Sequence, residues 1–154
     1  VACDDDDDAG NDQQTVEIIG NWYSSGDNVA PLLVTYFTVD SIYAEFHEDQ
    51  TYLVEQYNVG NTSDTPDLIY TGTYVVEKSD VGEIYTIVLT QELPFAATSE
   101  GIYEIKTSPE VLWYEVVQTS GTQNTPPTPE DGFGSSNGGQ FAETNIQKFI
   151  RITE

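Results

Sequence analysis

Most of the chain is a succession of short, β-prone segments separated by turn residues, and this spacing constrains the fold more than any other feature. In the first segment, Ile18 and Trp22 fall on one face of a strand, and Ile19 and Tyr23 fall on the other. Gly20 gives this strand a place to bend or to approach a neighbour closely. The alternation predicts half-buried strands.

Later segments pair into three predicted hairpins: 42–46 with 51–57, 68–77 with 84–90, and 102–107 with 111–118. A closing strand is predicted at 146–152, while the pattern of 32–39 fits either a strand or a short covering helix. About eight or nine short strands at hairpin spacing are typical of a sandwich or a barrel. We predict an all-β, antiparallel up-and-down β-barrel whose last strand pairs with its first, because closure removes exposed edges.

Charge limits the partners that this chain can have. It has 154 residues, which suits one compact domain, and 27 Asp plus Glu against 4 Lys plus Arg give a net charge of −23. Such a chain repels phosphate, so nucleic acid is excluded as a partner. We expect a strongly solvated surface.

The chain opens with an acidic stretch in which Cys3 precedes the run Asp4–Asp8. Five consecutive aspartates repel each other and resist burial, so residues 1–15 are predicted to be a flexible tether and residues 16–154 the barrel domain. Cys3 is the only cysteine, which leaves no internal disulfide.

Residues 119–140 form a second segment of unusual composition, rich in Gly, Ser, Thr, Asn and Pro. Only one strand's worth of chain follows, so we interpret the segment as a long loop rather than a domain boundary. Long loops in compact domains are often functional or mobile. We predict a mobile loop that guards one end of the barrel.

No arrangement in the sequence points to catalysis or to a metal. The stretch 134–138 matches the Gly-x-Ser-x-Gly elbow of hydrolases, but that elbow needs a strand-turn-helix setting and a downstream histidine. The only histidine, His47, lies far upstream, and alone it cannot build a zinc site. Carboxylates such as Glu45 and Glu48 near it fit a glycosidase pair, but clusters of this kind arise by chance in so acidic a chain. We predict no enzymatic activity, metal site or cofactor.

The ten tyrosines are more informative. If Trp22 points inward, the alternation places these aromatic residues inward with it: Phe46, Tyr52, Tyr74, Tyr85, Tyr103 and Tyr114. They fit either a packed aromatic core or a cup whose phenol hydroxyls hold a semi-polar ligand. A barrel of about eight strands is either just filled or holds one small ligand. For the second case, the candidate ligand-binding residues are Tyr52, Tyr85, Tyr103 and Tyr114.

Short motifs in the chain resemble the lipocalins. Gly20-x-Trp22 matches the signature of their first strand, and the only arginine, Arg151, lies on the predicted last strand, where lipocalins place an arginine over that tryptophan. The stretches 46–52 and 72–74 resemble the interior pattern of lipocalin-like lipoproteins of the Bacteroidota, although Gln50 replaces a glycine of that pattern. The resemblance implies a calycin-type barrel with Gly20, Trp22 and Arg151 as its structural signature.

The first residues also resemble a processing signal. Val1-Ala2-Cys3 is similar to the end of a lipobox, in which small residues precede the cysteine that becomes lipidated. The acidic run after it resembles the signal that sends Bacteroidota lipoproteins to the outer face of the outer membrane. These resemblances imply a protein anchored through Cys3 at the outer membrane or cell surface.

From all these features we expect a surface binding module for a small hydrophobic or glycan-like ligand held inside the barrel. The alternative is a filled barrel that acts as a structural or protein-interaction module. The sequence indicates no particular protein partner for either.

Overall fold

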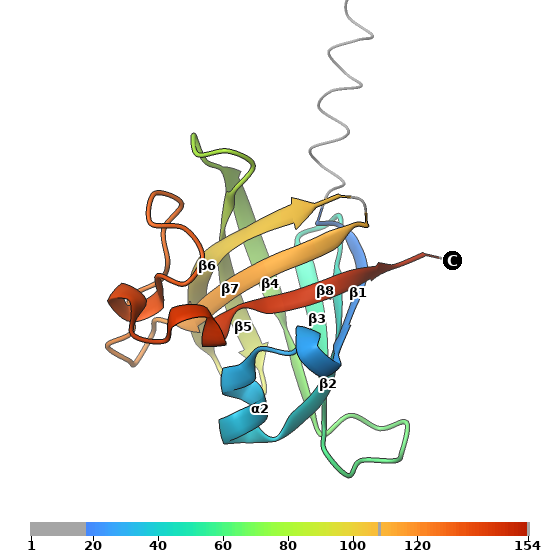
Figure 1. Ribbon diagram of the computed structural model, residues 1–154. Coiled ribbons are helices and arrows are strands. Elements are labelled where there is room, and N and C mark those ends of the chain that lie inside the picture. Colours follow the sequence, from blue (N-terminus) through green and yellow to red (C-terminus); the bar gives the residue numbers. More distant parts are fainter. Residues whose placement is uncertain (1–17, 108, 154) are drawn as a thin grey trace, which may run out of the picture.

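The protein is a closed β-barrel. The computed structural model describes residues 18–107 and 109–153, and in them eight antiparallel strands follow one another around the barrel in chain order (Figure 1). The strands are β1 (Gly20–Ser25), β2 (Val39–Phe46), β3 (Thr51–Asn58), β4 (Leu68–Lys78), β5 (Tyr85–Leu93), β6 (Ala97–Lys106), β7 (Val111–Gln118) and β8 (Gln147–Ile152). Strand β8 pairs with β1, with Arg151 opposite Trp22, which closes the sheet. The predicted all-β, up-and-down barrel is confirmed.

The stretch between β1 and β2 is helical. Of the two structures that the pattern of 32–39 allowed, a strand or a short covering helix, the helix is observed. A short 3-10 turn, η1 (Gly26–Asn28), leads into α2 (Pro31–Phe37). Pro31 suits the first turn of the helix, because an N–H group at that position would have no intrahelical acceptor, and proline has none to leave unpaired. The helix ends at Thr38, whose backbone is left-handed (φ 53°). None of the helices in the described residues has the length and apolarity that a membrane-spanning helix needs.

One end of the barrel, where β1 begins and β8 ends, is filled with side chains. The large residues packed there are Trp22, Phe46, Tyr74, Tyr85, Ile87, Tyr103 and Leu112. The rings of Tyr85 and Tyr103 stack with their centres 5.0 Å apart. We call this the closed end.

Arg151 lies over Trp22 at the closed end, as the lipocalin resemblance implied. Its guanidinium carbon is 4.2 Å from the centre of the fully buried indole ring. The same group donates a hydrogen bond of 2.9 Å to the Ile19 carbonyl and lies 3.0 Å from the Glu110 carboxylate. Arg151 therefore ties the start of β1 to the turn between β6 and β7.

The opposite end carries α2 and the long segment between β7 and β8, which contains the 3-10 turns η2 (Ser136–Gly139) and η3 (Ala142–Asn145) (Figure 1). The segment is held by Glu115, a fully buried residue of β7. Its carboxylate accepts hydrogen bonds from the N–H of Gly134 (2.7 Å), the N–H of Ser136 (3.2 Å) and the Ser136 hydroxyl (2.6 Å).

The long segment is also fixed at its start, where the Thr98 carbonyl accepts hydrogen bonds from the N–H groups of Thr119 and Ser120. The predicted position at one end of the barrel is correct, and these contacts anchor the segment at two places, while its mobility stays a prediction. Ser136, the serine of the hydrolase-like pattern, is fully buried against Glu115 and serves this anchor.

Candidate binding cavity

A cavity of about 470 Å³ occupies the half of the barrel that faces α2. Its wall consists of inward-pointing side chains of β2 to β8, together with residues of α2 and of the segment between β7 and β8. The apolar lining residues are Leu32, Leu33, Phe37, Ile42, Ala44, Phe46, Val54, Leu89, Val116, Val117, Phe141 and Phe149. The polar lining residues are Tyr52, Gln56, Tyr70, Gln91, Ser99, Tyr114, Gln118, Asn124, Asn145 and Gln147.

Side-chain size explains why only one half is hollow. The inward positions of β6 run Ala97, Ser99, Gly101 and Tyr103 from the α2 end to the closed end, so the small residues come first and the large one last. Such a gradient leaves space at one end of a small barrel, whose interior large side chains would otherwise fill.

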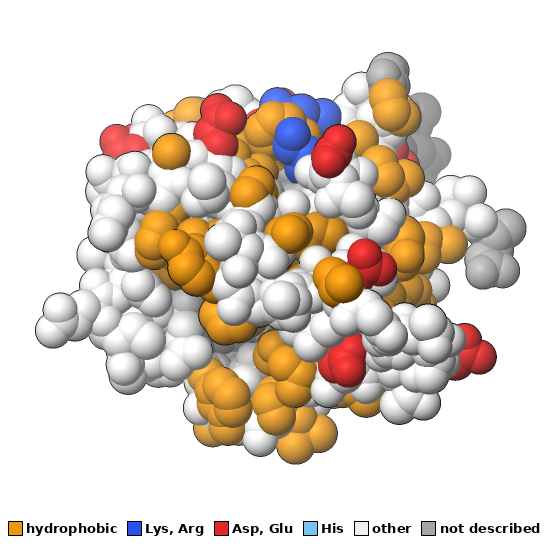
Figure 2. All heavy atoms as spheres, turned by 60° about the horizontal axis from the view of Figure 1, so that its bottom comes forward, with side chains coloured by type: hydrophobic (Ala, Val, Ile, Leu, Met, Phe, Trp, Pro, Cys, Tyr) orange, Lys and Arg blue, Asp and Glu red, His pale blue; other side chains and the backbone are white. Residues whose placement is uncertain are grey.

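The rim of the cavity is apolar on the side of α2. Figure 2 turns this end of the barrel toward the reader and shows hydrophobic side chains gathered on it. On α2, Val34, Tyr36 and Phe37 are 43%, 73% and 58% exposed, and Phe37 also lines the cavity. The mouth therefore presents an apolar surface to an entering molecule.

The amide side chains of the wall are held in place by the protein itself. Gln118 donates a hydrogen bond to the Ser120 carbonyl (2.9 Å), and Asn145 donates one to the Val116 carbonyl (3.2 Å). The Gln147 side chain accepts a hydrogen bond from the N–H of Ala30. These contacts orient neutral polar groups around the mouth without adding charge to it.

Two tyrosines and a phenylalanine form the deep part of the wall. The Phe46 ring packs near both tyrosines, and its centre is 6.4 Å from that of Tyr52 and 6.3 Å from that of Tyr114. Burial, with the charge of Glu92, raises the pKa of Tyr52 to about 12, and burial raises the pKa of Tyr114 further. Both side chains are therefore neutral hydroxyl donors at any ordinary pH.

The four tyrosines expected to meet a ligand divide between the two ends. Tyr52 and Tyr114 line the cavity, whereas Tyr85 and Tyr103 are packed at the closed end and do not line it. Sequence reasoning missed the amides of the wall. For Gln56 a signal was present, because it falls on the same face of β3 as Tyr52 and Val54.

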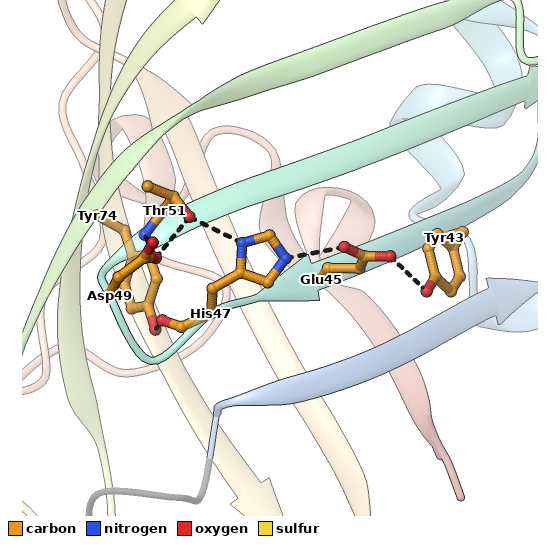
Figure 3. A network of polar contacts seen from close by, with 6 residues as sticks. All are labelled: Tyr43, Glu45, His47, Asp49, Thr51 and Tyr74. Carbon is orange, nitrogen blue, oxygen red and sulfur yellow. Dashed lines mark hydrogen bonds and ion pairs between the residues drawn. The ribbon is translucent and has the colours of Figure 1, made fainter. Parts of the chain in front are cut away.

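A second polar cluster lies on the hairpin between β2 and β3, away from the cavity lining (Figure 3). Nε2 of His47 is 2.8 Å from the Glu45 carboxylate, which also accepts a hydrogen bond of 2.7 Å from the Tyr43 hydroxyl. Nδ1 of His47 is 2.8 Å from the Thr51 hydroxyl, which donates to the Asp49 carboxylate at 2.6 Å.

This chain of contacts joins β2 to β3 at their turn. The hydrogen bond from His47, and then that from Tyr43, lowers the pKa of the Glu45 carboxyl. Tyr74 fixes the turn from the inside by donating to the His47 carbonyl (2.8 Å). Within the described residues, no group of three or more His, Cys, Asp or Glu side chains is placed to hold a metal ion. We interpret the cluster as a set of contacts that stabilises the β2–β3 hairpin.

No protein-family model, curated protein or solved structure matches this chain. The cavity between α2 and the closed end is therefore the feature on which a functional proposal has to be built.

Proposed function

We propose that the protein is a binding module that holds a small, largely apolar molecule in the barrel cavity. The observation that carries this proposal is an open space of about 470 Å³ with an apolar wall and a few oriented polar groups. Ligand pockets have volumes of roughly 300–1,000 Å³ and this mixture of linings. The cavity also argues against the alternative of a barrel filled throughout, since side chains fill the closed end alone.

The fold supports placing this binding module near the lipocalin-like lipoproteins. The supporting features are the closed antiparallel barrel and the stacking of Arg151 on Trp22 beside Gly20. Neither feature identifies a ligand, so the proposed ligand chemistry comes from the cavity wall.

We further propose that Cys3 carries a lipid that anchors the protein to the outer membrane or cell surface. Cys3 lies outside the described residues, and the proposal rests on Val1-Ala2-Cys3 and the acidic run after it. One acyl chain binds membranes only marginally, so stable anchoring requires more than one chain. Mass spectrometry of the N-terminal peptide from the native protein should show the added acyl mass, and a free thiol there would overturn the anchor.

Blocking the cavity tests the binding function. Val54 lines the cavity from the middle of β3, so Val54→Trp places a large ring in the open space. Val75 faces outward from β4 and is 59% exposed, which makes Val75→Trp a matched control. The neutral fluorophore N-phenylnaphthylamine should brighten with the wild-type protein and with Val75→Trp, but not with Val54→Trp. An equal response from all three proteins, each with the circular dichroism of a folded barrel, would reject the cavity as the site.

A further inference from the structure

We propose that the cavity selects uncharged ligands that carry a hydrogen-bond acceptor, such as a carbonyl oxygen, and that the hydroxyls of Tyr52 and Tyr114 bind this acceptor. The inference rests on the proposed binding function and specifies its ligand class. The remainder of the ligand is apolar, because the rest of the deep wall consists of residues such as Phe46, Val54 and Leu89.

The hydroxyls of Tyr52 on β3 and Tyr114 on β7 differ from those of the two inward tyrosines of β4. Tyr70 donates to the Gln56 side chain at 3.2 Å, and Tyr74 donates to the His47 carbonyl at 2.8 Å. Within the described part of the chain, the hydroxyls of Tyr52 and Tyr114 make no hydrogen bond to another residue, although both backbones are paired in the sheet. Among the described residues, the only fully buried side-chain polar atom without a partner is Ser24 Oγ, so the two hydroxyls reach the open space of the cavity. They are therefore available as donors to an acceptor on a molecule bound there.

The position of the two rings suits a shared acceptor. Tyr52 comes from β3 and Tyr114 from β7, and both ring centres lie close to the ring centre of Phe46, at 6.4 and 6.3 Å. The two phenols also interact electrostatically, since Tyr52 contributes to raising the pKa of Tyr114. The donors therefore face the same region of the cavity from different strands.

The wall disfavours a charged ligand of either sign. Among the described residues that line the cavity there is no Asp, Glu, Lys, Arg or His, although the chain has 27 acidic residues. A buried ion without a partner is costly, because desolvation is not repaid. The nearby charge of Glu92 already disfavours a negative charge at Tyr52, and the same field opposes an anionic ligand head there.

Three probes that share one ring system test the ligand class by calorimetric titration. Acetylnaphthalene carries a carbonyl acceptor, ethylnaphthalene has the same shape without it, and naphthoate carries a negative charge. We expect acetylnaphthalene to bind about five- to tenfold more tightly than ethylnaphthalene, the effect of one or two net hydrogen bonds. Naphthoate should bind at least about tenfold more weakly than acetylnaphthalene at neutral pH.

Removing both hydroxyls should abolish the preference. In the double variant Tyr52→Phe/Tyr114→Phe, acetylnaphthalene should fall to the affinity of ethylnaphthalene, which itself should change less than about twofold. If the double variant does not fold, the same titrations are made with Tyr52→Phe and Tyr114→Phe separately, and each should reduce the preference for acetylnaphthalene. Tyr23→Phe, on the exposed outer face of β1, is the matched control and should keep the wild-type preference.

The outcomes separate the inference from the proposed function. Equal binding of acetylnaphthalene and ethylnaphthalene, or a preference that survives in the double variant, overturns the role of the two tyrosines and leaves the binding function intact. Naphthoate as the tightest probe overturns the selection for neutral ligands. If neither these probes nor N-phenylnaphthylamine binds the wild-type protein, the binding function fails and the inference fails with it.

Discussion

Arg151 covers the face of the Trp22 indole, and the two residues stand opposite each other where the last strand pairs with the first. A guanidinium over a desolvated indole face gains roughly 0.5–2 kcal/mol. Lysine supplies the charge but neither the planar stack nor the forked donors. We therefore expect Arg151→Lys to lower the free energy of unfolding by about 1–2 kcal/mol, and Trp22→Ala to lower it by about 3–5 kcal/mol.

The two losses should not add, because each variant removes the same contact. Denaturant unfolding of the two single variants and the double variant gives the coupling energy, expected at about 0.5–2 kcal/mol. Trp22→Phe takes the place of Trp22→Ala if the latter does not fold. A coupling energy of zero would show that the stacking of Arg151 on Trp22 contributes nothing to stability.

Gly20 is required by the same contact. Its backbone has a φ of +138°, and a Cβ atom there would lie 2.7 Å from Nη1 of Arg151. We expect Gly20→Ala to destabilise the barrel by about 1–3 kcal/mol, from backbone strain and displacement of the guanidinium. Gly26 is also left-handed, with a φ of +59°, but a Cβ there meets no atom within 4 Å. Thermal unfolding should therefore show a smaller loss for Gly26→Ala, and equal losses would contradict the clash.

Glu115 should decide whether the segment between β7 and β8 stays in place. Glu115→Ala leaves the N–H groups of Gly134 and Ser136 without their acceptor, which costs about 1–3 kcal/mol for each buried group. Limited proteolysis should then cut within 119–146 sooner than in the wild-type protein. Glu100→Ala is the control, since Glu100 accepts a hydrogen bond from Thr119 in the same segment but is not fully buried. Cleavage at the same rate in all three proteins would remove Glu115 as the anchor.

The polar cluster on the β2–β3 hairpin should make the free energy of unfolding depend on pH. The pKa of Glu45 is lowered from its ordinary value of 4.5, chiefly by the hydrogen bond with His47. A lowered pKa in the folded state means that the contribution is present above that ordinary value and is lost as pH falls through the folded-state pKa.

Glu45→Gln should therefore lower the free energy of unfolding by about 0.2–1 kcal/mol at neutral pH, the usual size for a partly exposed pair. The difference from the wild-type protein should shrink as the pH falls below 4.5. Glu48→Gln, an exposed change in the same turn, is the control. A difference that stays constant down to acid pH would contradict the contribution of the Glu45 carboxylate.

The strands with strict alternation were the predictable part of the fold. The segment 42–46 was predicted and lies within the observed β2 (Val39–Phe46), because Ile42, Ala44 and Phe46 alternate with Tyr43 and Glu45. Strand β6 begins at Ala97, five residues before the predicted 102, because its first residues are small or polar. Their smallness is what leaves room for the cavity, so the β-prone signal is weakest beside the site.

The cavity itself could not be predicted from side-chain type. Tyr52 and Tyr103 are the same residue on inward-facing positions, yet one borders the cavity and the other is packed at the closed end. Their roles depend on distance along the barrel axis, which the alternation of a strand does not encode. The anchoring of Ser136 by Glu115 joins residues that are 21 positions apart, and no local pattern marks that contact.

Closure of the barrel by β1 and β8 also makes its two ends different. The described chain begins beside Trp22 and finishes just after β8, so both of its ends leave from the closed end, while the mouth with α2 faces the other way (Figure 1). A lipid anchor on Cys3 would therefore join the barrel on the side of the closed end. The predicted tether would leave the mouth clear of the attachment, and a captured molecule would enter at the opposite end of the barrel.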